Sequence, residues 1–232
     1  MRKFGPGILV AAAFIGPGTV TTASLAGANF GFALVWALIF SIFTTIVLQN
    51  MASRLGIVSQ NGLATALRNS IAHPIVRLGV LILIVAAIGI GNAAYQGGNI
   101  LGAALAANLL TDIPTSILAI VMGALAFSLL FSGRYRLIET CLIILVSLMS
   151  VVFIACVVLN PPDWHLMVSQ LIPNDISQFS NVMVIALIGT TVVPYNLFLH
   201  ARAAQEKWKD VDTMQALQEA KIDTSLSIGM GG

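Results

Sequence analysis

An apolar run over residues 5–29, interrupted by Gly16-Pro17-Gly18, constrains the fold of this chain more than any other feature. The run carries no charge and is long enough to cross a bilayer. Proline lacks the amide hydrogen that a helix interior needs, and glycine relaxes the backbone. Freed backbone groups in a membrane must be buried in protein or line a watery cavity, so we predict a broken helix with a binding site at the break. A proline kink in a continuous helix is the alternative.

A second apolar segment over residues 179–204 is interrupted in the same way, by Thr191-Val192-Val193-Pro194-Tyr195-Asn196. Two broken helices in one chain are typical of the two halves of an inverted repeat, which meet at a shared site. The pair therefore favours broken helices over kinked ones. It predicts breaks at residues 16–19 and 192–196 that face each other.

The composition excludes an ordinary soluble domain, because 58% of the residues are hydrophobic and only 9% are charged. We predict an all-α, polytopic membrane protein. Basic residues form no patch with aromatic ones, and no glycine-rich phosphate loop is present, so we expect neither nucleic acid nor nucleotide as a partner. The three histidines fall in different segments and no carboxylate pair shares a span, so we expect no enzyme and no cofactor.

The hydrophobic segments predict six spans and a truncated seventh. The expected spans are residues 5–29, 31–50, about 78–110, 116–131, 138–159 and 179–204. The charged tract over residues 202–223 is expected as an aqueous loop or an interfacial helix. The apolar segment that begins at Ser225 holds too few residues to cross, so we expect a fragment of a longer transporter, with an obligate half-transporter as the alternative.

These spans place all eleven Lys and Arg residues on one side of the membrane. The positive-inside rule makes that side the cytoplasm, so we expect a multi-pass plasma-membrane protein with a cytoplasmic amino terminus. Trp164 and Trp208 fall near span ends, where aromatic belts form.

The two interrupted segments resemble those of the Nramp family of divalent metal transporters. That family carries Asp-Pro-Gly-Asn in its first helix, where this chain has Gly16-Pro17-Gly18-Thr19. It carries Met-Pro-His-Asn-Leu-Tyr-Leu-His in its sixth, where residues 193–200 read Val-Pro-Tyr-Asn-Leu-Phe-Leu-His. Residues 52–58 and 222–224 look like further family signatures. The resemblance implies an amino-acid-transporter-like (LeuT-type) fold, with a first five-helix repeat over residues 1–160 and the start of the second, inverted repeat over residues 161–232.

The resemblance also implies where a substrate binds, although most of the family's metal ligands are absent. Gly16 stands where the family has aspartate, Thr19 where it has asparagine, and Val193 where it has methionine. The backbone carbonyls of Ala13 and Thr190 match carbonyl ligands of the family. The whole predicted substrate site comprises Ala13, Gly16, Thr19, Thr190, Val193, Tyr195 and Asn196. No side chain is assigned as a metal ligand.

A polar pathway is implied by Gln96, Asn99 and His200. Gln96 and Asn99 occupy third-helix positions at which the family has acidic residues, and because neither titrates we do not expect proton coupling by the family's route. His200 matches a family histidine, which either titrates in an inner vestibule or hydrogen-bonds to a neighbour. Tyr195 replaces another family histidine, and either presents its hydroxyl or ring to a substrate or serves as a packing residue.

Three functions stay open. The first is a secondary transporter that moves a divalent metal ion, hard or partly hydrated, such as Mg²⁺ or Mn²⁺. The second is a transporter of a small organic or amino-acid-like solute, because the amides beside Pro17 at a half-helix amino terminus suit a carboxylate. The third is a non-transporting sensor or scaffold. The expected partners are a small ion or solute and the lipid bilayer. Without the aspartate and the methionine, we predict no tight, dehydrated Mn²⁺ binding.

Overall fold

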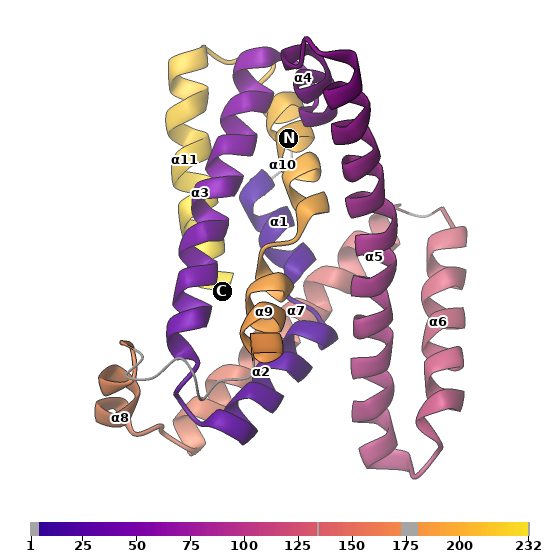
Figure 1. Ribbon diagram of the computed structural model, residues 1–232. Coiled ribbons are helices and arrows are strands. Elements are labelled where there is room, and N and C mark those ends of the chain that lie inside the picture. The colour runs from indigo at the N-terminus through magenta and orange to yellow at the C-terminus, as the bar shows by residue number, and fades with distance from the viewer. Residues whose placement is uncertain (1–4, 134, 173–180, 232) are drawn as a thin grey trace. The chain divides into compact units, whose positions relative to one another are not determined.

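The computed structural model describes residues 5–133, 135–172 and 181–231, and every regular element in these ranges is a helix. The helices are α1 (Pro6–Phe14), α2 (Pro17–Phe30), α3 (Val35–Ser59), α4 (Leu63–Ser70), α5 (Pro74–Thr111), α6 (Thr115–Phe131), α7 (Tyr135–Leu159), α8 (Trp164–Ser169), α9 (Asn181–Thr191), α10 (Pro194–Lys207) and α11 (Thr213–Gly231) (Figure 1). The predicted all-α class is confirmed.

Several of these helices have the length and apolar composition of membrane spans. Val35–Ser59, Pro74–Thr111 and Asn181–Lys207 are each long and apolar enough to cross, the last of them combining α9 and α10. Thr115–Phe131 and Ser147–Leu159 are shorter apolar helices. The chain is therefore a polytopic membrane protein, as predicted.

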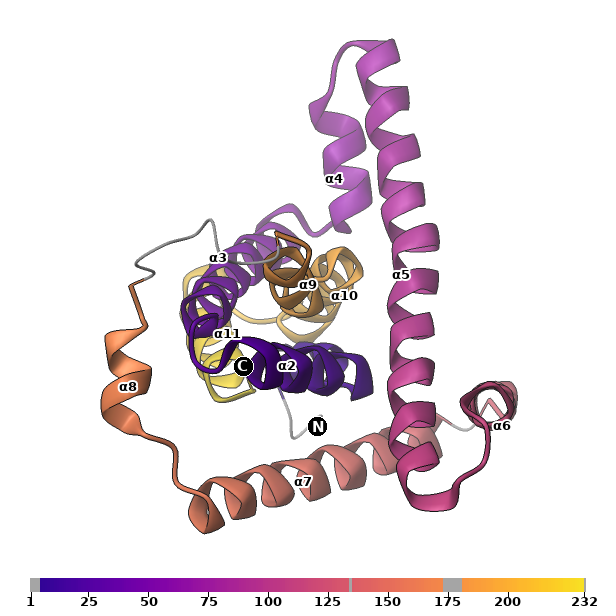
Figure 2. The same cartoon turned by 60° about the horizontal axis from the view of Figure 1, so that its bottom comes forward.

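Two helix boundaries differ from the sequence-based expectation. The second span continues to Ser59 instead of ending at Asn50, so that Arg54 lies on α3. The third helix begins at Pro74, because proline is well suited to a first helical turn. Figure 2 shows the short helix α4, which was not predicted, between the end of α3 and the start of α5.

The described residues form two compact units. The first contains the chain up to Phe14, Leu38–Tyr95, and the residues from Ile188 onward. The second contains Ile15–Ala37 and Gln96–Leu187, so α5 divides between the units after Tyr95. These units are defined by compactness, whereas the predicted repeats over residues 1–160 and 161–232 are defined by internal symmetry. The division into repeats therefore stays a prediction.

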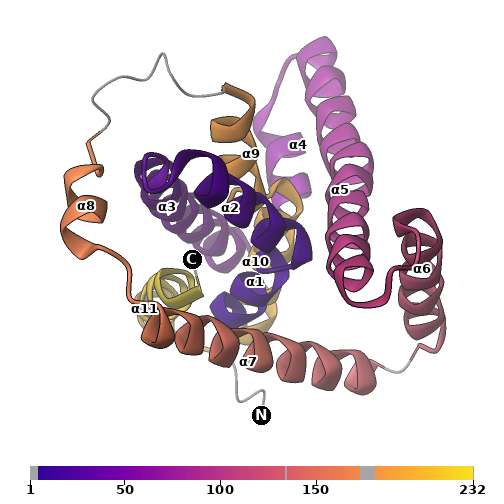
Figure 3. The ribbon, with the colours of Figure 1, turned by 90° about the horizontal axis from the view of Figure 1, so that it is seen from below.

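Small residues bring the helices of the first unit close together. In this unit α1 contacts both α10 and α11, and Figure 3 shows these helices grouped with α3. A Cβ atom at Gly56 of α3 would overlap the carbonyl oxygen of Ala201 on α10. Membrane helices use such small residues to approach closely. Other buried alanines of α3, α10 and α11 include Ala52, Ala203, Ala204, Ala216 and Ala220.

Trp208 belongs to the interior of the first unit, and the predicted aromatic-belt position is wrong for this residue. It is 2% exposed and packs in a cluster with Ile57, Ala204, Ala216 and Ala220. Its indole Nε1–H donates to Glu219 Oε2 at 2.8 Å. The turn after α10 folds α11 back against Trp208. Much of the charged tract over residues 202–223 is therefore helical, and it helps to bury the indole.

In the second unit, α2 and the later part of α5 approach each other through glycine. A Cβ atom at Gly102 of α5 would lie 2.8 Å from Thr21 Oγ1 and 2.9 Å from the Pro17 carbonyl oxygen. Any larger residue at position 102 would push α2 away from α5, so this close approach requires glycine.

Candidate functional site

The first break lies at Ile15 and Gly16, between α1 and α2. Gly16 is the N-cap residue of α2, with φ −147° and ψ 175°, and Pro17 occupies the first helical turn. Proline disfavours helical geometry at the residue before it, while its own fixed φ suits a helix start. The sequence Gly-Pro therefore ends one helix and begins another. The break is two residues wide, and Thr19, which was expected within it, lies inside α2.

The second break uses the same local geometry. Val192 and Val193 separate α9 from α10, and Val193 is the extended N-cap residue, with φ −99° and ψ 121°, before Pro194. Here too the break is narrower than predicted, because Tyr195 and Asn196 already lie in the first turn of α10. Both predicted interruptions are confirmed as helix ends, not kinks.

Two tyrosine hydroxyls lie at carbonyl oxygens beside these breaks. In the first unit, Tyr95 Oη donates to the Phe14 carbonyl at 2.8 Å and lies 3.4 Å from the Thr190 carbonyl oxygen. Tyr195 Oη donates to the Ala13 carbonyl at 3.0 Å. The two rings pack edge to face, with centroids 6.1 Å apart. The structure thus brings Ala13, Thr190 and Tyr195 together and adds Tyr95, a residue that sequence reasoning missed.

Within the second unit, the start of α2 is held by the predicted polar residues of α5. The backbone N–H of Gly18 donates to Asn99 Oδ1 at 3.0 Å, and Asn99 Nδ2 donates to Gln96 Oε1 at 3.2 Å. A Cβ atom at Gly16 would lie 2.9 Å from the same Asn99 oxygen. Asn99 therefore caps a free amide of the half-helix, and Gln96 orients Asn99.

His200 is fully buried on α10 and bonds to neighbours through both ring nitrogens. Nδ1 lies 3.0 Å from Gln49 Oε1, and Nε2 lies 3.4 Å from Thr224 Oγ1. Of the two alternatives for this residue, the neighbour-bonded one matches the structure. Gln49 was missed, although a signal exists. The buried polar residues of α3 recur every fourth position, as Ser41, Thr45, Gln49 and Ser53.

Asn196 is the most unusual polar residue near the second break. It is 0% exposed, and neither its amide nitrogen nor its amide oxygen has a hydrogen-bond partner among the described residues. Val193 beside it is also buried, at 5% exposure. A buried amide without partners is costly, so Asn196 has hydrogen-bonding capacity available for a ligand or a water molecule.

The acidic residues of the described chain do not form a metal site. No group of three or more His, Cys, Asp or Glu side chains is close enough to hold a metal ion in the part that the structure describes. The carboxylate of Asp223 on α11 instead accepts the backbone N–H of Gly7 at 2.8 Å, where it faces the positive end of the α1 dipole.

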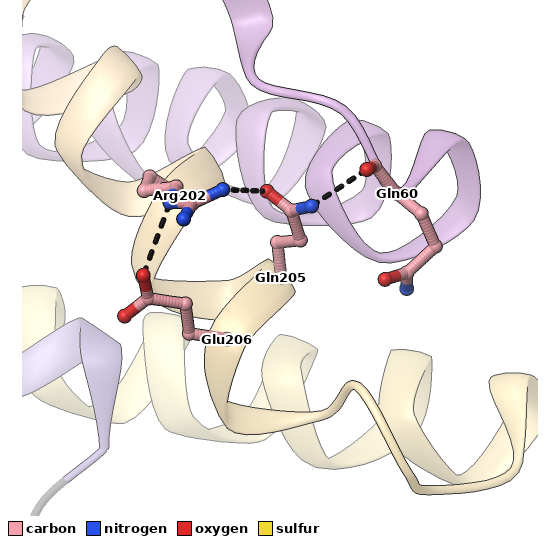
Figure 4. Close-up of polar contacts among 4 residues, drawn as sticks. All are labelled: Gln60, Arg202, Gln205 and Glu206. Atoms are coloured by element: carbon pink, nitrogen blue, oxygen red, sulfur yellow. Dashed lines mark hydrogen bonds and ion pairs between the residues drawn. The ribbon is translucent and has the colours of Figure 1, made fainter.

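The exposed polar residues at the end of α10 connect this helix to the residue that follows α3. Arg202 Nη1 donates to Gln205 Oε1 at 3.0 Å, and Gln205 Nε2 donates to the Gln60 carbonyl at 2.6 Å. Arg202 also pairs with Glu206 at 3.1 Å. Figure 4 shows these contacts, which satisfy the charges within the helix end.

Comparison with known proteins extends over almost the whole chain. Residues 7–232 match the family model described as "Nramp: Natural resistance-associated macrophage protein-like". Similar curated proteins include the "Divalent metal cation transporter MntH" of Staphylococcus aureus strains JH9, Newman and COL. Each is 31% identical over 235 residues, which cover 97% of this chain and 51% of the relative. The chain therefore spans about half the length of the curated relatives it matches.

Proposed function

This chain belongs to the Nramp family, and on that premise we propose that it carries a divalent metal ion across the membrane as a secondary transporter working by alternating access. The observation that supports the proposal best is the pair of proline-started half-helices, α2 and α10, each preceded by a short break. At such breaks the backbone can offer groups to a substrate inside a membrane.

We propose that groups at the two breaks bind the cation and that the chain has a LeuT-type inverted-repeat fold. Its site residues are Ala13, Gly16, Thr19, Thr190, Val193, Tyr195 and Asn196, and a polar pathway runs past Gln96, Asn99 and His200. Members of the family with aspartate and methionine at the positions of Gly16 and Val193 have an anionic and a soft ligand there. This chain has neither, so a hard or partly hydrated ion such as Mg²⁺ suits it better than a dehydrated transition metal.

The organic-solute alternative is less well supported. It needs free amides at the start of α2 for a carboxylate, but the Gly18 amide donates to Asn99 Oδ1. A carboxylate would have to displace that side chain. The proposal is therefore a metal-ion transporter and not an amino-acid transporter, an enzyme or a passive scaffold.

We further propose that the protein lies in the plasma membrane with its amino terminus in the cytoplasm. The argument is the distribution of Lys and Arg, since all eleven fall on one side of the predicted spans. The neutral side chains of Gln96 and Asn99 indicate that transport does not depend on proton transfer at these positions.

Uptake into proteoliposomes tests the proposal. The complete protein is expected to move Mg²⁺ or Mn²⁺ inward, and an excess of neutral amino acids is expected to leave the rate unchanged. Thr19→Val should slow uptake. Thr21→Val is the matched control on α2, because Thr21 is not one of the proposed site residues and its hydroxyl donates to the Pro17 carbonyl at 2.8 Å. Amino-acid uptake without divalent-cation uptake would contradict the proposal.

A further inference from the structure

Carbonyl groups at the ends of two helices converge in the first unit. Ala13 and Phe14 are the last residues of α1, and Thr190 is the last but one of α9. The last four carbonyls of a helix have no amide partner inside it, and they carry the negative partial charge of the helix dipole. Converging carbonyl oxygens of this kind are the groups with which proteins replace the water around a cation.

Each of the two α1 carbonyls already has a hydrogen-bond donor. Tyr195 Oη lies 3.0 Å from the Ala13 oxygen, and Tyr95 Oη lies 2.8 Å from the Phe14 oxygen. Tyr95 Oη is also 3.4 Å from the Thr190 oxygen. A phenol has one hydrogen to donate, so the shorter contact to Phe14 is the stronger bond. The Tyr95 hydroxyl nevertheless stands between the carbonyls of α1 and α9.

The rings of these tyrosines hold the hydroxyls in place. Tyr95 comes from α5 and Tyr195 from the first turn of α10, and the rings meet edge to face at 69° with centroids 6.1 Å apart. Aromatic pairs favour this arrangement. Rotation of one ring away from its carbonyl would therefore disturb the other, so both hydroxyls act as fixed donors.

We propose that Tyr95 and Tyr195 determine which cations the site accepts, by occupying the carbonyl oxygens that a dehydrated cation would bind. This inference rests on the function proposed above. A cation that binds carbonyls directly must first displace a hydroxyl. A cation that keeps its water can accept the existing arrangement and bind through that water.

Ca²⁺ and Mg²⁺ differ in this property. Ca²⁺ takes six to eight oxygen ligands in flexible geometry and readily uses backbone carbonyls, whereas Mg²⁺ dehydrates reluctantly and usually keeps several waters. The tyrosine hydroxyls therefore select against Ca²⁺ relative to Mg²⁺. The family motifs alone do not predict this preference for Mg²⁺ over Ca²⁺, because the preference depends on two tyrosine hydroxyls that come from different helices.

The test compares Ca²⁺ and Mg²⁺ affinities of the complete protein by titration calorimetry, in the wild type and in Tyr195→Phe and Tyr95→Phe. Phenylalanine keeps the ring and removes only the hydroxyl. Loss of one hydroxyl donor should raise the Ca²⁺ affinity relative to the Mg²⁺ affinity by roughly two- to tenfold. Ser70→Ala is the control in the first unit, because it removes an exposed hydroxyl that donates to the Leu67 carbonyl at 3.0 Å within α4, and it should leave the ratio unchanged.

The possible outcomes separate this inference from the proposed function. A ratio that stays constant in both variants, or affinities for both ions that fall together, would overturn it, since the hydroxyls would then be spectators or direct ligands. If one variant does not fold, the other decides. A wild type that binds neither ion would instead contradict the proposed function. Size-exclusion chromatography of each variant checks that it is folded.

Discussion

Gly56 of α3 is the position where adding one methyl group should do the most damage. A Cβ atom there would overlap the carbonyl oxygen of Ala201 and lie 2.8 Å from its carbonyl carbon and 3.0 Å from its Cα atom. Carbon atoms pack best at about 3.5–4.0 Å, and the overlapping oxygen is closer than either carbon, so α3 and α10 must separate by about 1 Å or more at this point. The atoms that collide are backbone atoms, which cannot rotate away.

We therefore expect Gly56→Ala to destabilise the protein. Overpacking of a close contact costs about 1–3 kcal/mol, and alanine regains only about 0.5–1 kcal/mol over glycine in a helix. The middles of these two ranges leave a net loss of about 1 kcal/mol, which corresponds to roughly a five- to tenfold shift of the unfolding equilibrium. Gly79→Ala on α5 is the matched control. A Cβ atom there meets nothing within 4 Å, so this change should be neutral or slightly stabilising.

Trp208 gives the assay a local reporter, because it is buried in the cluster beside this contact. In a background with Trp36→Phe and Trp164→Phe, its fluorescence follows detergent-induced unfolding of α3, α10 and α11 alone. The midpoint should fall for Gly56→Ala and not for Gly79→Ala. Equal midpoints for the two variants would refute the close-contact argument.

Three further results are expected. Hydrogen bonds from the Trp208 indole and the Gln215 amide lower the pKa of Glu219. The ionised carboxylate therefore stabilises the folded protein above the unfolded-state pKa of Glu219, and this stabilisation is lost as the pH falls through the lower folded-state pKa. When Trp208 fluorescence is followed during acid titration, it should change at a pH below the ordinary pKa range of glutamate. A change within that range would contradict the hydrogen bond. Gln49→Leu leaves His200 Nδ1 buried without its partner and should cost about 1–3 kcal/mol in the same unfolding assay, whereas an unchanged midpoint would show the contact to be incidental. A cysteine in place of Lys207 should react with impermeant reagent only after the membrane is opened, and labelling in intact cells would reverse the proposed topology.

Local sequence was sufficient to predict the breaks and most helices. Pro17 and Pro194 each dictate an extended residue before them and a helix start after them, and these effects depend on neighbouring residues alone. The boundaries at Gly16 and Val193 follow directly. The predicted end of the second span at Asn50 is wrong, because α3 continues to Ser59 and long basic side chains such as that of Arg54 are compatible with a helix at a span end.

Contacts between distant segments were not predictable in the same way. The bond from Tyr95 to Phe14 joins residues 81 positions apart, and Gln49 and His200 are 151 positions apart. Nothing in the residues around Tyr95 indicates that its hydroxyl meets a helix end. Trp208 was placed in an aromatic belt for a similar reason, since its proximity to a span end is visible in the sequence and the return of α11 over it is not.

Titration of the complete protein with Mn²⁺ tests the central claim most directly, because the claim is a divalent-cation site that lacks the family's charged and soft ligands. The wild type should bind Mn²⁺ only weakly, and the double variant Gly16→Asp, Val193→Met should bind it much more tightly. The new side chain at position 16 meets the movable end of Asn99, 2.9 Å from its Cβ position, and not backbone, so it can be accommodated. Low-micromolar Mn²⁺ binding by the wild type, or no gain in the double variant, would contradict the account.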